Sequence, residues 1–219
     1  AIRERVVSQL MNVSAELAQS VAAGLGIAGV EPMPRAIARV PRAEVRQSAA
    51  LSLLAHPGNG GIRSRRIALI VCDGVDGEAV ATLQAQLLDA GAVPRLVGQR
   101  VGPFTTQQGE TMQADASMEN EPAPLFDALV LPDGERAVKT LSLDGRALEF
   151  VKEEYRHCKP LLVLGASAAL FEGAGASAVL PDGTPDPGVV QAQAGDIDEA
   201  ATAFIEAPGK HRHWERETD

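Results

Sequence analysis

The chain has 219 residues, 45% of them hydrophobic and 22% charged; these are the proportions of ordinary globular proteins, and the length suffices for one main domain with an appendage. Its 20 Lys and Arg residues against 29 Asp and Glu give a formal net charge of −9 at pH 7, which repels a phosphate backbone, so we expect no nucleic-acid partner. No apolar run is long enough to cross a bilayer and the first residues do not resemble a targeting leader, so we expect a cytoplasmic protein with no membrane partner.

Residues 1–28 predict a single amphipathic helix. Ser14 can cap it, and Leu17, Val21 and Leu25 recur at helical spacing on one face. A helix of this length is marginal alone and must bury its apolar face against another element, and the rest of the chain offers no obvious one. We therefore expect this helix to pack against a part of a larger protein.

Residues 29–64 predict an extended linker arm, because prolines interrupt regular structure and arginines recur along the segment. The residues that carry this pattern are Pro32, Pro34, Pro41 and Pro57, with Arg35, Arg39, Arg42 and Arg46. The arginines either serve only solubility or line a strap that crosses an acidic neighbouring surface.

Residues 65–219 alternate between strand and helix patterns. The predicted strands are Arg66–Cys72, Val93–Gly98, Asp127–Pro132 and Leu161–Leu164. The predicted helices bury Val80, Leu83 and Leu87 before Gly91; Leu148 and Val151 within residues 143–158; and Ile197, Ala201, Phe204 and Ile205 after a cap at Asp196. The polar residues 102–121 predict a hairpin or loop. This alternation predicts the α/β class, with a doubly wound parallel sheet.

The stretch "PLLVLGASAALFEG", from Pro160 to Gly173, predicts a sharp turn between a strand and a helix. Turns of this kind often present a nucleophile at their tip. The residue at the tip is Gly165, which has no side chain, and Ser167 falls inside the first helical turn, where it favours a bond to the backbone. The sequence therefore predicts no catalytic residue, only a degenerate elbow at Gly165 and Ser167.

Three motifs, "IALIVCDGVDGEAV", "FDALVLPDGE" and "LLVLGASAAL", resemble the class I glutamine amidotransferase-like superfamily, especially its intracellular-protease and deglycase branch. This resemblance implies a flavodoxin-like sandwich. In that branch an acidic side chain early in the first helix lowers the pKa of a cysteine on the elbow. The matching positions here are Gly165 and a site near Ala79, beside Glu78, so the resemblance implies that the nucleophile is missing.

A second resemblance covers nearly the whole chain. The segments "IRERVVSQLMNVSAELAQSVAAGLGI", "SAALSLLAHPG", "RRIALIVCDGVDGEAV", "FDALVLPDG", "YRHCKPLLVLG" and "HRHWERE" are similar, in order, to the C-terminal part of the large-subunit haem catalases. The resemblance implies that residues 1–28 are the last helix of a catalase core and that residues 65–219 are a flavodoxin-like domain outside the haem chemistry. Because the chain starts within a helix pattern, we expect it to be a fragment of a longer protein.

The same resemblance implies haem in the parent protein and no cofactor in this chain. Iron ligation by tyrosine needs a positioned phenolate. The chain has only Tyr155, in "KEEYRHC", where two glutamates disfavour a phenolate, and His56 in "AHPGNG" lacks the surroundings of a distal histidine.

Other candidate residues favour structural roles. Cys72 and Cys158 are too few for a disulfide framework and lack metal-ligand spacing, so we expect reduced thiols, with a minor redox role for Cys72 as the alternative. His157 and Cys158 are adjacent on a helix and do not face each other. His211 and His213 lack a third ligand nearby, which favours a solvated tail over a metal site. No G-x-G-x-x-G follows the first strand, so dinucleotide binding is unsupported.

Three functions compete. The first is a non-catalytic C-terminal domain of a large haem catalase that supports subunit stability, assembly of a homotetramer with the catalase core, and access to the haem channel. The second is a chaperone-like holdase for unfolded client proteins, since a detached domain would expose apolar docking surface. The third is an amidotransferase-like or deglycase-type enzyme, against which the missing elbow cysteine argues.

Overall fold

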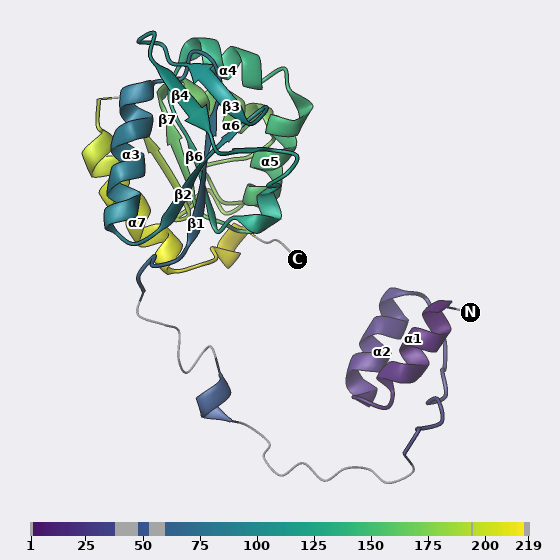
Figure 1. The fold of residues 1–219 in the computed structure, drawn as a ribbon. Coiled ribbons are helices and arrows are strands. Elements are labelled where there is room, and N and C mark those ends of the chain that lie inside the picture. Colours follow the sequence, from purple (N-terminus) through teal and green to yellow (C-terminus); the bar gives the residue numbers. More distant parts are fainter. Residues whose placement is uncertain (1, 38–47, 53–59, 194, 217–219) are drawn as a thin grey trace. The chain divides into compact units, whose positions relative to one another are not determined.

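The computed structural model describes residues 2–37, 48–52, 60–193 and 195–216, and the chain divides into two compact units, residues 1–55 and 56–219 (Figure 1). Some predictions concern residues outside these ranges, namely His56, Pro41, Pro57, Arg39, Arg42 and Arg46. Within the described ranges, no helix is long and apolar enough to span a membrane.

The first unit contains two packed helices rather than the single predicted one. They are α1 (Ile2–Leu10) and α2 (Ala15–Gly24), and a short 3-10 helix, η1 (Ala49–Leu51), follows later in the chain. Ser14 caps α2 as predicted, by accepting a hydrogen bond from the Leu17 backbone N–H. The prediction that this helix has no partner in the chain is wrong, because α1 packs against it and the two bury Val7 and Ala18.

The start of the predicted arm belongs to the first unit. The Ser8 hydroxyl donates to the carbonyl of Glu31, and the Asn12 amide donates to the carbonyl of Met33. The Arg35 guanidinium donates to the Asn12 side chain at 2.9 Å. These polar groups on and after α1 hold residues 31–35 beside the helix, so the arm is shorter than predicted at this end.

The end of the predicted arm belongs to the second unit. Ile62 is buried in the core of that unit, and the Ser64 backbone N–H donates to the carbonyl of Gly91 at 2.8 Å. An apolar residue just before the first strand explains this difference, because its burial draws the preceding backbone onto the sheet.

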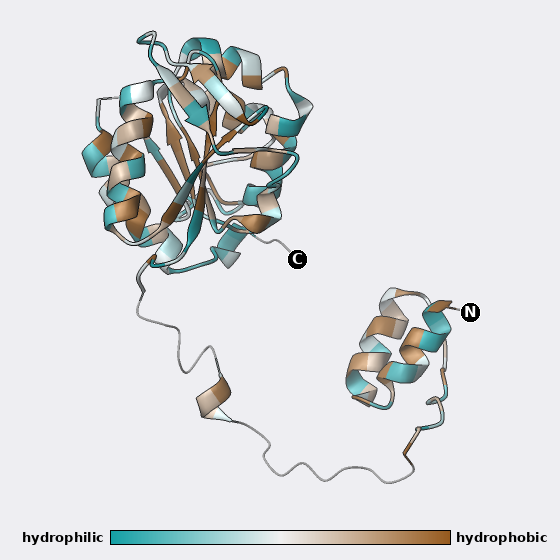
Figure 2. Ribbon diagram, in the orientation of Figure 1, coloured by the Kyte–Doolittle hydropathy of each residue, from teal (hydrophilic) through white to brown (hydrophobic). Residues whose placement is uncertain are grey.

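The second unit is built on a six-stranded parallel sheet of order β5-β2-β1-β6-β7-β8. Its strands are β1 (Arg66–Val71), β2 (Val93–Gly98), β5 (Ala116–Ser117), β6 (Ala128–Leu131), β7 (Leu161–Leu164) and β8 (Val189–Ala192). The four residues of β6 and the four of β7 are all buried, as expected for strands covered on both faces. Figure 2 shows these strands as the hydrophobic centre of the unit.

Helices cover both faces of the sheet. Helices α3 (Gly77–Asp89) and α7 (Ile197–Gly209) lie together on one face, while α4 (Glu135–Leu141), α5 (Gly145–Arg156) and α6 (Ala168–Gly173) lie on the other (Figure 1). A hairpin of β3 (Gly102–Thr105) and β4 (Thr111–Ala114) lies at one end of the sheet. Short 3-10 helices complete the unit: η2 (Ala123–Leu125), η3 (Gly165–Ser167) and η4 (Trp214–Arg216).

Most of the side chains that were predicted to face the core from the helices are buried. Val80, Leu83, Leu87, Val151, Ala201 and Phe204 are buried as predicted. Asp196 is the N-cap residue of α7, as predicted, but its side chain forms no cap hydrogen bond. Helix α4 and strand β8 were not predicted, because each is short and carries little periodicity.

The C-terminal residues are not a solvated tail. Arg216 forms a buried ion pair with Asp186, donates to the carbonyl of Lys159 at 2.6 Å, and lies 4.8 Å from the centre of the Tyr155 ring. His213 is also buried, and its backbone N–H donates to the carbonyl of Cys158. The predicted tail packs inward because the Asp186 carboxylate and the Lys159 carbonyl form an acceptor site that Arg216 fills.

Candidate functional site

The turn after β7 has the predicted elbow geometry. Strand β7 ends at Leu164, Gly165 begins η3 with a positive φ of 50°, and α6 follows from Ala168. A residue with a side chain rarely adopts this backbone conformation, which explains why glycine is suited to the tip. The fold therefore keeps the sharp turn that the sequence indicated.

The space above the elbow is filled by the side chain of Asp133. A Cβ atom placed on Gly165 would lie 2.5 Å from Asp133 Cγ and 2.7 Å from its Oδ1, so no larger residue fits without displacing this carboxylate. Asp133 Oδ1 accepts hydrogen bonds from the backbone N–H groups of Gly134, at 2.7 Å, and Ala166, at 2.8 Å. The elbow thus presents two N–H donors, and the chain's own carboxylate occupies them.

Asp133 reaches this place because of the sheet topology. It follows β6, which pairs in parallel with β7, so the carboxyl ends of both strands meet at one edge. Its backbone carbonyl also accepts from the Asp76 N–H at 2.8 Å, which ties the turn to the start of α3. Asp133 was not predicted from the sequence, although an Asp-Gly pair close to the end of a buried apolar strand is a signal for a functional turn.

Ser167 is placed as the sequence predicted. Its side chain is buried, with 2% of the residue exposed, and its hydroxyl donates to the carbonyl of Pro132. A hydroxyl committed to a buried backbone acceptor is not presented to a substrate.

The expected acid position holds no carboxylate at the elbow. Ala79 is fully buried in α3, and Glu78 is exposed in the first turn of that helix. The carboxylate of Asp76 caps the same helix by accepting from the backbone N–H groups of Glu78 and Ala79. The carboxylate that does reach the elbow comes from the end of β6.

The two cysteines lie on other elements. Cys72 follows β1 and is 6% exposed; burial, followed by the neighbouring Asp73 carboxylate, raises the pKa of its thiol to about 12. Such a thiol stays protonated near neutral pH, which disfavours the alternative redox role. Cys158 is fully buried, and His157 turns instead toward Glu153, with 3.1 Å between its Nε2 and the carboxylate.

The histidines near the C-terminus do not converge on a common point. His213 Nε2 lies 3.3 Å from the carbonyl of Ala207, whereas His211 Nε2 lies 3.9 Å from Asp127. In the described part of the chain, no group of three His, Cys, Asp or Glu side chains is arranged to hold a metal ion.

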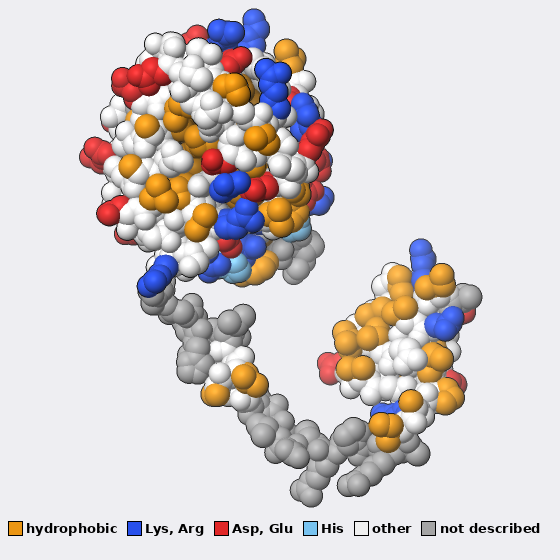
Figure 3. Space-filling model, in the orientation of Figure 1, with side chains coloured by type: hydrophobic (Ala, Val, Ile, Leu, Met, Phe, Trp, Pro, Cys, Tyr) orange, Lys and Arg blue, Asp and Glu red, His pale blue; other side chains and the backbone are white. Residues whose placement is uncertain are grey.

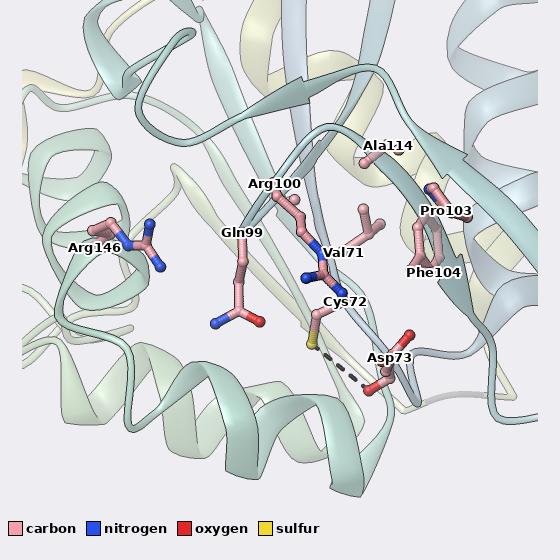
Figure 4. Close-up of a pocket in the computed structure, with 11 residues that line it drawn as sticks. Val71, Cys72, Asp73, Gln99, Arg100, Pro103, Phe104, Ala114 and Arg146 are labelled. Carbon is pink, nitrogen blue, oxygen red and sulfur yellow. Dashed lines mark hydrogen bonds between the residues drawn. The ribbon is translucent and has the colours of Figure 1, made fainter.

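A separate cavity of about 320 Å³ lies at the carboxyl ends of β1 and β2 (Figure 4). The hairpin residues Gly102, Pro103 and Phe104 border it, and Arg146 of α5 lies at its other side. In open α/β sheets, ligands bind outside the carboxyl ends of the strands near the point where strand order reverses. Strand β1 is at that point, since β2 lies on one side of it and β6 on the other.

Comparison with known proteins places the chain in a family. A family model described as the C-terminal domain found in long catalases matches residues 63–218. The chain belongs to this family. Among curated relatives, "Catalase HPII" of Pseudomonas putida is 35% identical over 218 residues, covering 99% of this chain and 28% of the relative. "Catalase HPII" of Mycobacterium avium is 36% identical over 228 residues, covering 100% of this chain and 31% of the relative.

The chain therefore spans less than a third of the length of these two catalases. The family model that it matches describes a C-terminal domain of long catalases. A solved structure with a similar fold is a two-domain protein from Anabaena variabilis with DJ-1/ThiJ/PfpI-like and ferritin-like domains. The TM-score is 0.57 with 20% identity, over 67% of this chain and 48% of that one. Both the predicted family and the predicted flavodoxin-like α/β class are confirmed.

Proposed function

We propose that the chain is a non-catalytic C-terminal domain of a long catalase and that it supports the stability, assembly and channel access of a parent enzyme that decomposes hydrogen peroxide. In this proposal, residues 1–28 complete the helical end of the catalase core, residues 29–64 link it to the domain, and residues 65–219 are the flavodoxin-like domain. The proposed partners are that core and the other subunits of a homotetramer in the cytoplasm.

The observation that carries the non-catalytic role is the occupied elbow. Asp133 fills the space over Gly165, and its carboxylate already takes the two N–H donors that could otherwise stabilise a developing anion. Ser167 and both thiols are buried, and the Ser167 hydroxyl is bonded to the carbonyl of Pro132. These contacts count against the amidotransferase-like or deglycase-type alternative.

The catalase family implies haem for the parent protein, and in the part of the chain that the structure describes, Tyr155 does not fit a role as its ligand. The ring of Tyr155 packs edge-on against Phe171 at 5.9 Å between ring centres, and the Arg216 guanidinium covers it at 4.8 Å. A tyrosine held between these two groups is not available as an axial ligand. We therefore assign the haem to the core of the parent protein.

The first unit supports association with another surface. Several large apolar side chains of its two helices and following segments are exposed: Ile2, Val6, Val13, Leu17 and Leu25. Figure 3 shows hydrophobic side chains gathered on the visible face of this unit. Exposed apolar clusters of this kind mark interaction sites, and a catalase core is the partner that the family suggests.

The test uses the full-length parent protein and a variant that ends before Arg65. We expect the same peroxide turnover per haem, faster thermal inactivation, and loss of the tetramer measured by light scattering. A shortened variant that keeps the tetramer and its inactivation half-life would overturn the proposal. Loss of turnover per haem in an intact tetramer would overturn the non-catalytic role in particular.

The exposed apolar side chains of the first unit also favour a holdase role as the second candidate. This role is tested with the chain as given, by light scattering of a heat-aggregating client protein. Suppression at equimolar ratio that Leu17→Ser and Val13→Ser remove together would support it. No suppression would leave the structural role as the single candidate of the two.

A further inference from the structure

The cavity at the carboxyl ends of β1 and β2 is separate from the elbow, and nothing in the proposed function uses it. Its floor is Val71 and Cys72 at the end of β1, and the residues after β2 form one wall. Gly98 allows the hairpin to approach, because a Cβ atom there would lie 2.9 Å from the Arg100 carbonyl and 3.0 Å from the Ala114 side chain. The cavity is therefore a consequence of how β2 and the hairpin meet.

Most charged groups around the cavity are already paired. Arg146 bonds the carboxylates of Asp144 and Glu119, and Gln99 donates to Asp144 at 2.7 Å. These partners, with Arg146 first, lower the pKa of Asp144 to about 2, so this carboxylate remains ionised at neutral pH. Asp73 accepts the Thr105 backbone N–H at 2.7 Å.

Arg100 is the exception. Its guanidinium forms no hydrogen bond or ion pair with any of the residues that the structure describes. Figure 4 shows Arg100 and Gln99 extending from the end of β2 toward the side of the cavity where Cys72 and Asp73 lie, with Arg146 on the opposite side. A guanidinium offers a planar set of donors that matches a carboxylate or phosphate group.

The remaining walls are apolar. Val71, Phe104 and Ala114 contribute side chains that are otherwise buried, and the protonated thiol of Cys72 adds no charge. A volume of about 320 Å³ is at the small end of ligand sites, so only a small molecule fits. The carboxylate of Asp73 at the same cavity opposes a second negative charge on the ligand.

We propose that this cavity binds a small singly charged oxoanion, a short carboxylate or a phosphate monoanion, whose charged group pairs with Arg100 and whose carbon atoms contact Phe104 and Val71. The site is at the sheet edge where this fold class places ligands.

The test is titration of the full chain, followed by backbone amide NMR, with acetate, butyrate, succinate and the monoanion dimethyl phosphate, each at constant ionic strength. We expect saturable shifts of the Gly98, Gln99 and Gly102 amides. Butyrate should bind more tightly than acetate because of the apolar walls, and succinate more weakly than butyrate because of Asp73. Dimethyl phosphate, which carries one negative charge, distinguishes a general oxoanion site from one that selects carboxylates.

The matched variants are Arg100→Gln and Arg63→Gln, which remove the same charge from exposed positions inside and outside the cavity. We expect at least a tenfold weaker Kd for butyrate with R100Q and an unchanged Kd with R63Q. The proposal is overturned if no ligand of the set gives saturable shifts at these amides, or if R100Q and R63Q weaken binding equally. Equal weakening would show a non-specific effect of charge.

Discussion

The carboxylate of Asp133 supports the elbow through two backbone hydrogen bonds, and Asp133→Ala measures what they contribute. A hydrogen bond to a charged group contributes about 1.5–3 kcal/mol. Gly134 is buried, so its N–H has little access to water in the variant, whereas the partly exposed Ala166 N–H can recover some hydration. We therefore expect a loss of about 3 kcal/mol, near the lower end of the sum of two bonds.

For a unit of this size, about 3 kcal/mol corresponds to a decrease of about 6–12 °C in Tm. The assay is thermal unfolding followed by circular dichroism, repeated with increasing formate at constant ionic strength. Formate can occupy the vacated place between the two N–H groups, so it should restore stability progressively, by about 1.4 kcal/mol at ten times its Kd.

The control for this experiment is Asp182→Ala. Asp182 also accepts two hydrogen bonds, from the Thr184 backbone N–H at 2.9 Å and its hydroxyl at 2.6 Å, but it lies in an exposed turn. We expect a small change in Tm and no specific effect of formate. The reasoning is refuted if Asp133→Ala unfolds within 1 °C (about 0.3 kcal/mol) of the native chain, or if formate stabilises both variants equally.

Three further changes test other parts of the second unit. Gly165→Cys should lower the urea midpoint of unfolding, because a side chain at a positive φ of 50° is strained and overlaps Asp133. The double variant with Asp133→Ala should lose less unfolding free energy than the sum of the two single variants, because the overlap is then absent. Burial raises the pKa of Glu154 from its ordinary 4.5 to about 8, so between these pH values the native state holds a proton that the unfolded chain releases. The free energy of unfolding should therefore fall as the pH rises from 4.5 to 8. Urea unfolding at pH 5 and pH 8 measures this fall, and Glu154→Gln should make it smaller. Arg216→Met leaves the fully buried Asp186 carboxylate without its cation and should cost about 3–5 kcal/mol by the same assay, whereas Arg212→Met should cost far less.

Four of the six strands and most of the helices around them were predictable, because their apolar residues recur at the periods of strands and helices. The run Leu161–Leu164 forms β7 with the predicted limits, and Val80, Leu83 and Leu87 form the buried face of α3. Each of these patterns lies within one element, where local periodicity determines which side chains face the core. The elbow was predictable for the same reason, because Gly165 directly follows an apolar strand.

The contacts that were not predictable join elements far apart in the chain. Arg216 pairs with Asp186, which lies 30 positions earlier in the chain, and donates to the carbonyl of Lys159, which lies 57 positions earlier. No local pattern in the sequence indicates the pairing of Arg216 with Asp186. The charged C-terminal residues were therefore predicted to be a solvated tail. Ile62 is a similar case, because its burial depends on the assembled sheet and its neighbours are polar or glycine.

Asp133 stabilises the elbow at a turn whose tip residue has no side chain. The backbone N–H groups of Gly134 and Ala166 point to one place, because β6 and β7 pair in parallel and end at the same edge of the sheet. Left unpaired, two partly buried donors would destabilise the turn. A carboxylate from the end of the neighbouring strand satisfies both donors and needs the space that a side chain at position 165 would take. Glycine at the tip and aspartate at position 133 therefore form one arrangement, and a side chain at position 165 would require the carboxylate at position 133 to move or be lost.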